Sequence, residues 1–146
     1  MSDDQARAAA AAGLARWHDM VAAWDFAQLP PLLHPDAVFR SPMAHTPYHG
    51  ALALAVALKT VSEVFQDFRY HRGFVSEDGM SACLEFSARV GEKELKGVDL
   101  LRFDAEGRLV EMEVMVRPMS GLAALGEEMG RRLGGALGAA RRGPTA

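Results

Sequence analysis

One acidic residue of this sequence stands out because of its surroundings. Asp99 lies in the middle of residues 97–103 (GVDLLRF), whose branched and aromatic side chains are typical of a β-strand. The two-residue period of a strand places the Asp99 carboxyl on the same face as Leu101 and Phe103. An acid among apolar side chains loses hydration, which raises its pKa, so it can donate a hydrogen bond when neutral or take a proton from carbon when ionised.

Two interpretations of Asp99 are open at this point. Strand pairing around the turn Gly91-Glu92 places Asp99 opposite Leu84, on the face that also carries Ala82 and Phe86. The last predicted strand adds Met112, Val114 and Val116 to the same wall. In the first interpretation Asp99 lines an apolar pocket suited to a ring-shaped or aliphatic ligand. In the second, it forms an ion pair with Arg69, Arg102 or Arg117, or reaches solvent.

The other reactive side chains are weaker candidates for a catalytic or metal-binding role. Ser41 and His45 flank the segment SPMAH, where a histidine can shuttle protons, although a histidine in a loop is more often solvated. Cys83 is out of phase with Leu84 and is expected to face away from the pocket, which argues against a nucleophilic role. No histidine pair has the spacing of a metal motif on one helix face, so no metal site is expected.

Composition narrows the classes of function. The chain has 146 residues, 49% of them hydrophobic and 24% charged, with a net charge of -3 and one cysteine. This length fits one domain, and we predict residues 1–136 to form it, with a flexible, glycine-rich tail over 137–146. Scattered Lys and Arg residues argue against nucleic-acid binding. The lack of a long apolar run or a signal-peptide pattern predicts no membrane association and a cytoplasmic location.

The elements that would position Asp99 follow from periodicity and turn signals. Residues 2–5 (SDDQ) form a capping box that should start a long helix, Asp25 and Gln28 indicate a short second helix, and a further helix is predicted over 51–68. Four strands joined by tight turns are predicted for residues 68–118, and a last amphipathic helix is predicted to begin near Ser120. This order predicts an α+β domain: a strongly curved, mostly antiparallel, cone-shaped sheet packed on the N-terminal helices, with an added C-terminal helix.

The segments LARW, HPDAVFRSP, YHG and GVDLLRFDAEGRLVEM together resemble the nuclear transport factor 2-like superfamily. Within it, the chain is most similar to SnoaL-like proteins, which are related to ketosteroid isomerases and polyketide cyclases. The resemblance spans roughly Leu14 to Arg117 and implies a cone-shaped fold that hosts many chemistries as well as non-enzymes. It also implies a homodimer through the sheet, whose outer face carries Val98, Leu100 and Met115.

The resemblance to ketosteroid isomerases is partial at the site. Those enzymes combine a general-base Asp with an oxyanion hole made of a Tyr and a protonated Asp. Asp99 matches the protonated Asp, but Ser41 stands at the position of the base and Trp17 at that of the Tyr. This pattern argues against ketosteroid isomerase activity. SnoaL-like cyclases resemble the chain better, because a single wall carboxylate is expected to accept the proton, and Asp99 fits that role. The Asp-Arg-Asp arrangement of limonene epoxide hydrolases is not found on the matching strands.

The resulting hypothesis is a SnoaL-like protein with an apolar pocket for a small hydrophobic compound of polyketide, steroid or terpenoid type. Asp99 would transfer a proton in a cofactor-independent isomerase or cyclase reaction. The alternative is a non-catalytic ligand-binding or dimerising accessory protein of the same fold. The residues predicted to contact the ligand are Trp17, Phe39, Ser41, His45, Leu84, Phe86, Leu101, Met112 and Val114.

Overall fold

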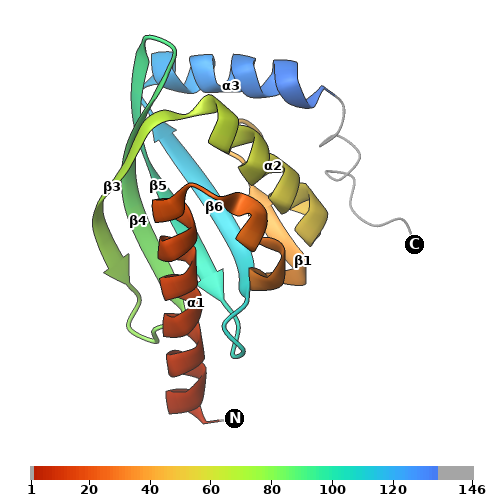
Figure 1. Ribbon diagram of the computed structural model, residues 1–146, viewed down its shortest axis with the longest axis vertical. Coiled ribbons are helices and arrows are strands. Elements are labelled where there is room, and N and C mark those ends of the chain that lie inside the picture. The colour runs from red at the N-terminus through yellow and green to blue at the C-terminus, as the bar shows by residue number, and fades with distance from the viewer. Residues whose placement is uncertain (1, 135–146) are drawn as a thin grey trace.

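The computed structural model describes residues 2–134, so the tail predicted for residues 137–146 lies outside the described part of the chain. Three α-helices, two short 3₁₀ helices and one six-stranded sheet make up the described residues (Figure 1). The elements in chain order are α1 (Asp3–Ala23), η1 (Phe26–Gln28), η2 (Pro30–Leu32), β1 (Leu33–Arg40), β2 (Tyr48–His49), α2 (Ala51–Val64), β3 (Gln66–Val75), β4 (Ser81–Val90), β5 (Lys93–Phe103), β6 (Leu109–Arg117) and α3 (Met119–Leu133).

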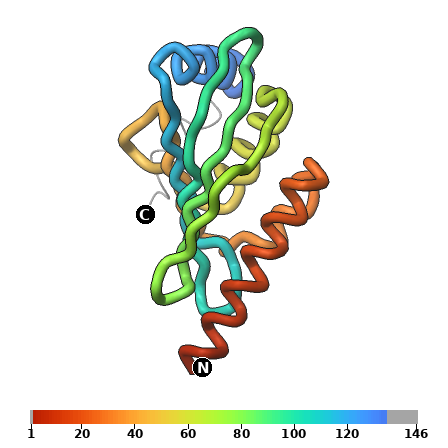
Figure 2. The backbone as a smooth tube through the Cα atoms, turned by 90° about the vertical axis from the view of Figure 1, so that its left-hand side faces the viewer, coloured from red at the N-terminus to blue at the C-terminus, as the bar shows by residue number. Residues whose placement is uncertain are grey.

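The sheet is curved and unclosed, with the strand order β2-β1-β6-β5-β4-β3. Strand β1 runs parallel to β6, and every other neighbouring pair is antiparallel. Figure 2 shows α1 and α2 on the same side of the sheet, while α3 crosses its upper end. This arrangement confirms the predicted α+β class, with helices covering one face of a mostly antiparallel sheet.

Local signals explain where α1 begins and how it is attached. The Ser2 side chain accepts a hydrogen bond from the Gln5 backbone, and the Gln5 side chain accepts one from the Ser2 backbone, which confirms the capping box. Farther along, α1 approaches the β5–β6 turn so closely that a Cβ on Gly13 would overlap the carbonyl oxygen of Gly107. This contact, together with a hydrogen bond from Arg16 to the same oxygen, fixes α1 against the sheet.

The prediction of a helix over 51–68 is wrong at its C-terminal end. Helix α2 ends at Val64, and β3 begins at Gln66. The rings of Phe65 and Phe68 pack on Phe86 of β4, with centroid distances of 5.7 and 5.1 Å. Sheet pairing and aromatic packing therefore outweigh the helical periodicity that continues through Phe65. The four predicted strands of the second half are confirmed, and α3 begins at Met119, next to the predicted start.

Most of the core lies between the helices and the concave face of the sheet. It includes Trp17 and Met20 of α1, Leu54 and Leu58 of α2, and Leu101 of β5. A second cluster beneath α3 joins Leu125 to residues of β4 and β5. No helix within residues 2–134 is both long and apolar enough to span a bilayer.

Candidate functional site

The pairing of three central strands places Asp99 on the concave face. Asp99 pairs with Leu84 of β4, as predicted, and with Val114 of β6. Its side chain is buried, with only 5% of the residue exposed. None of the ion pairs among residues 2–134 includes Asp99. The alternative of a salt bridge to Arg69, Arg102 or Arg117 is therefore wrong.

Asp99 lines a cavity of about 370 Å³ between the sheet and the helices. This volume falls within the usual range of small-molecule sites. Aromatic and aliphatic side chains from α1, α2, β3, β6 and α3 form most of the wall, including Trp17, Val61, Phe68, Val114 and Leu133. Asp99 is the only acidic residue among the lining residues of the described chain, and that lining contains no Lys, Arg or His. Any proton transfer inside this cavity therefore depends on Asp99 or on a hydroxyl group.

A hydrogen-bond relay holds the Asp99 carboxyl. The Trp17 Nε1–H donates to the Tyr70 hydroxyl oxygen at 3.0 Å, and the Tyr70 O–H donates to Asp99 Oδ2 at 2.5 Å. Asp99 Oδ1 receives no hydrogen bond from residues 2–134, and no fully buried side-chain oxygen there lacks a partner. Oδ1 therefore keeps some accessible surface, so one carboxyl oxygen is fixed by Tyr70 while the other is free to meet a ligand.

Burial raises the pKa of Asp99 from 3.8 to about 7, because the charged form loses hydration, while the hydrogen bond from Tyr70 opposes part of this shift. The pKa of Tyr70 lies well above its ordinary value of 10.0, first because of burial and then because of the nearby Asp99 charge and hydrogen bond. Tyr70 therefore stays protonated and remains a donor at neutral pH. A carboxyl group with a pKa near 7 can both take and return a proton under the same conditions.

Tyr70 was not predicted from the sequence, and a β-bulge explains why. The turn at Asp78-Gly79 sets the pairs Val75 with Ala82 and Gly73 with Leu84. Regular continuation of this register would pair Tyr70 with Ser87, on the outer face. The register shifts between Tyr70 and Gly73, so Tyr70 pairs with Phe86 and points inward. An inward-facing Tyr can be found from the sequence only if this bulge is anticipated.

The structure brings together part of the predicted ligand-contact set. The cavity lining contains Trp17, Phe39, Ser41, Met112 and Val114, whose roles as ligand contacts stay predictions. The remaining four do not line it. His45 is exposed on the loop after β1, whereas Leu84, Phe86 and Leu101 are buried in the core. Phe86 in particular is covered by Phe65 and Phe68, which the sequence did not place on this face.

Two further side chains help to define the surroundings of the site. Cys83 faces away from the cavity, as predicted, because it pairs with Leu100 on the outer face of the sheet. Trp24, at the C-terminal end of α1, lines the cavity, and its Nε1–H donates to the Ser62 carbonyl at 2.9 Å. Within residues 2–134 there is no group of three His, Cys, Asp or Glu side chains placed to hold a metal ion.

Comparison with known proteins identifies relatives of this architecture. The sequence profile of the SnoaL-like domain matches residues 14–112. A crystal structure of a steroid delta-isomerase from Pseudomonas aeruginosa is 65% identical, with a TM-score of 0.85, and the match covers 90% of this chain and 96% of that chain. An uncharacterised protein with a cystatin-like fold from Silicibacter pomeroyi is 31% identical, with a TM-score of 0.80 and coverage of 89% and 92%.

A more distant structure shares the fold alone. SalBIII, an epoxide hydrolase/cyclase-like enzyme of pyran ring formation in salinomycin, is 18% identical with a TM-score of 0.63, and the match covers 83% of this chain and 97% of that chain. No curated protein matches the sequence.

Proposed function

Because the chain belongs to the SnoaL-like domain family, we propose that it is a cofactor-independent isomerase that moves a double bond next to a ketone in an apolar, polycyclic compound. The observation that carries this proposal is the buried Asp99 carboxyl, held by Tyr70 at one oxygen and open to an apolar cavity at the other. The similarity to a steroid delta-isomerase supports a steroid-like ketone as the substrate class.

The site departs from the ketosteroid isomerase pattern at two positions. Trp17 replaces the Tyr of that pattern on the first helix, but Tyr70 supplies a phenolic hydroxyl to the acid from β3. The general-base position remains Ser41. A mechanism in this cavity therefore assigns the transfer of the proton to Asp99 itself.

The proposed reaction starts with ionised Asp99. Its Oδ1 takes a proton from the carbon between the ketone and the double bond, and the C–H electron pair moves into a conjugated dienolate. Protonated Asp99 then returns the proton to the far carbon of the former double bond, which gives the conjugated ketone. The hydrogen bond from Tyr70 stabilises the carboxylate before the first step and after the second, and apolar walls exclude water that would compete for the proton.

Ser41 is the candidate donor to the dienolate oxygen. Its Oγ accepts a hydrogen bond from the Met43 backbone at 3.0 Å, which leaves the O–H available to a ligand. Ser41 follows Arg40, which pairs with Glu113, so it lies beside Val114, the partner of Asp99. Ser41 and Asp99 are thus about two strand spacings, roughly 10 Å, apart at the backbone. This separation leaves room for a carbonyl group and its neighbouring carbon between the two side chains.

The decisive experiment measures isomerisation of the β,γ-unsaturated isomer of androstenedione by the ultraviolet absorbance of the conjugated product. We expect turnover by the wild type and a loss of about 100-fold or more in kcat for Asp99→Asn, since positioned acid–base groups contribute on this scale. The matched control is Asp36→Asn, which removes an exposed carboxyl and should leave kcat unchanged. Equal turnover by wild type and Asp99→Asn would refute the role of Asp99. Binding of the product androstenedione, with no isomerisation of its β,γ-unsaturated isomer, would favour the alternative of a ligand-binding protein.

A further inference from the structure

The relay that ends at Asp99 begins at a group that can only donate. The Trp17 Nε1–H donates to the Tyr70 hydroxyl oxygen at 3.0 Å, and the Tyr70 O–H donates to Asp99 Oδ2 at 2.5 Å. A hydroxyl group can donate or accept a hydrogen bond, whereas the indole N–H of a tryptophan is a donor only. The first hydrogen bond of the relay therefore has only one direction, from Trp17 to Tyr70.

Burial keeps this first hydrogen bond in place. Only 1% of Trp17 is exposed, so the indole N–H cannot turn to water instead. Among residues 2–134, the Tyr70 oxygen is the acceptor that this N–H meets. A buried donor without an acceptor is costly, so Trp17 should donate to Tyr70 whether Asp99 is ionised or neutral.

Aromatic contacts hold the Tyr70 ring. Phe68 packs against it edge to face with 5.0 Å between the ring centroids, and His18 of α1 does so at 5.7 Å. With the ring held, the hydroxyl hydrogen can still rotate about the C–O bond, which has two preferred positions in the plane of the ring. The Trp17 N–H takes one of these positions, so the Tyr70 hydrogen takes the other and points to Asp99.

The fixed direction of the relay decides which oxygen of Asp99 can carry a proton. With a proton on Oδ2, Tyr70 would have to accept from Asp99, and its own hydrogen would turn against the Trp17 N–H. One buried hydrogen bond would be lost, which disfavours this arrangement by roughly tenfold or more. With the proton on Oδ1, both hydrogen bonds of the relay remain.

We infer that Trp17 is a positioning residue for Asp99: by holding Tyr70 as a donor, it keeps the acid proton on Oδ1, the oxygen that is open to the cavity. Oδ1 is then the reacting atom in both steps, as the base when Asp99 is ionised and as the donor when Asp99 is protonated. The inference rests on the proposed function for the use of this proton. The position of the proton, however, is a property of the protein without a substrate, and it can be measured there.

Infrared spectroscopy reports which oxygen is protonated. At about pH 5.5 Asp99 is largely protonated while carboxyls with ordinary pKa values of about 4 are ionised, because burial raises the pKa of Asp99 to about 7. Subtracting the spectrum of Asp99→Asn from that of the wild type isolates the C=O band of the Asp99 acid. We expect the hydrogen bond from Tyr70 to the C=O at Oδ2 to lower the wavenumber of this band, so Tyr70→Phe should raise it.

Substitution of Trp17 tests whether its N–H sets the position of the proton. Trp17→Phe keeps an aromatic ring but removes the N–H, which frees Tyr70 to accept from Oδ2. Part of the Asp99 band should then move to higher wavenumber, because in that part the C=O is at Oδ1 and has no hydrogen bond from Tyr70. Benzothienylalanine at position 17 keeps the shape of the indole with sulfur in place of the N–H, so it should give the same shift even if Trp17→Phe does not fold.

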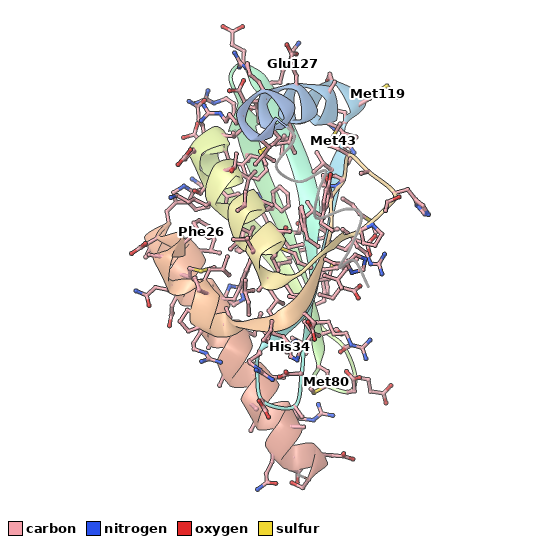
Figure 3. All side chains as sticks on the ribbon, turned by 90° about the vertical axis from the view of Figure 1, so that its right-hand side faces the viewer. Phe26, His34, Met43, Met80, Met119 and Glu127 are labelled. Atoms are coloured by element: carbon pink, nitrogen blue, oxygen red, sulfur yellow. The ribbon has the colours of Figure 1, made fainter. Side chains whose placement is uncertain are left out.

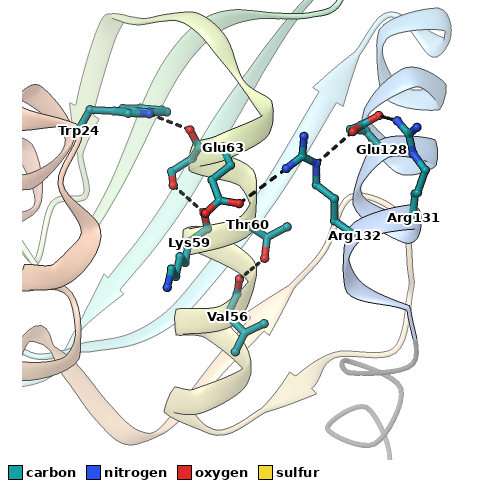
Figure 4. Close-up of polar contacts among 9 residues, drawn as sticks. Trp24, Val56, Lys59, Thr60, Glu63, Glu128, Arg131 and Arg132 are labelled. Atoms are coloured by element: carbon teal, nitrogen blue, oxygen red, sulfur yellow. Dashed lines mark hydrogen bonds and ion pairs between the residues drawn. The ribbon is translucent and has the colours of Figure 1, made fainter.

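Trp24→Phe is the matched control. Trp24 lies at the C-terminal end of α1 and also lines the cavity, and its ring packs edge-on against Phe26 with a centroid distance of 5.2 Å (Figure 3). Its Nε1–H donates to the Ser62 carbonyl at 2.9 Å, outside the relay (Figure 4). The control removes the same kind of donor and the same volume from the same helix, and it should leave the Asp99 band unmoved.

The outcomes separate this inference from the proposed function. An unmoved band in Tyr70→Phe would place the proton on Oδ2 and overturn the inference, and so would a wild type without an Asp99 acid band. An unmoved band in the variants at position 17, or an equal shift in Trp24→Phe, would show that the Trp17 N–H does not direct the relay. If the bands behave as expected but the wild type does not isomerise the β,γ-unsaturated isomer of androstenedione, the proposed function fails and the role of Trp17 stands.

Discussion

Replacing Asp99 with asparagine tests the central physical claim, because burial of a carboxyl should make the stability of the protein depend on pH. The pKa of Asp99 is about 7 in the folded protein, compared with an ordinary value of 3.8. The folded state binds this proton more tightly than the unfolded state does. Protonation of Asp99 therefore contributes to the free energy of unfolding in full below about pH 4, and this contribution is lost as the pH rises to about 7. Asp99→Asn removes this dependence and keeps an oxygen that can accept the Tyr70 hydrogen bond.

The size of the change in the free energy of unfolding follows from the size of the pKa shift of Asp99. Each pKa unit corresponds to about 1.4 kcal/mol, so ionising Asp99 in the folded protein costs about 4 kcal/mol above pH 7. Between pH 5 and pH 8 the pKa of about 7 predicts that the wild type loses about 3 kcal/mol of stability relative to Asp99→Asn. The variant should therefore be more stable than the wild type at pH 8, although a polar side chain has been changed in the core.

Urea denaturation of both proteins across this pH range measures the effect directly. The free energies of unfolding should converge towards acid pH and separate towards neutral pH, with a plateau above about pH 7. Asp36→Asn, at an exposed carboxyl, should run parallel to the wild type throughout. Parallel curves for wild type and Asp99→Asn would mean that the folded protein does not raise the pKa of this acid, which would refute proton transfer by a tuned Asp99 carboxyl.

Three further predictions concern the relay, the packing of α1 and the outer face of the sheet. Tyr70→Phe removes the hydrogen bond that lowers the pKa of Asp99, so the carboxyl should titrate at a higher pH than in the wild type; an unchanged NMR titration would contradict the relay. Gly13→Ala should reduce the free energy of unfolding by about 1–3 kcal/mol through overlap with the β5–β6 turn, whereas Gly130→Ala, the same change at an exposed position of α3 where the Cβ meets no atom of residues 2–134, should be neutral or stabilising in the same denaturation experiment. We propose that the outer face forms a homodimer, so sedimentation should give twice the 15.8 kDa chain mass and Met115→Glu should give monomers; a wild type that sediments as a monomer at micromolar concentration would refute this.

The sequence by itself determined the order of elements and the position of the acid. The capping box at Ser2, the turns at Asp78-Gly79 and Gly91-Glu92, and the alternation along β4 and β5 are local signals, and each depends on residues only a few positions apart. The Gly91-Glu92 turn fixes the register of its hairpin, so the pairing of Asp99 with Leu84 could be predicted by counting from it. The same counting placed Cys83 on the outer face.

Tertiary structure decided which side chains surround the acid. The bulge in β3 turns Tyr70 inward, and such a bulge depends on how the whole strand fits the curved sheet. The packing of Phe65 and Phe68 on Phe86 ended α2 early and removed Phe86 from the cavity wall. The contribution of α3 to the cavity wall could not be predicted from the sequence either, because that wall is built from helices and strands that lie far apart in the chain. Contacts between distant segments set these features, and local periodicity carries no information about such contacts.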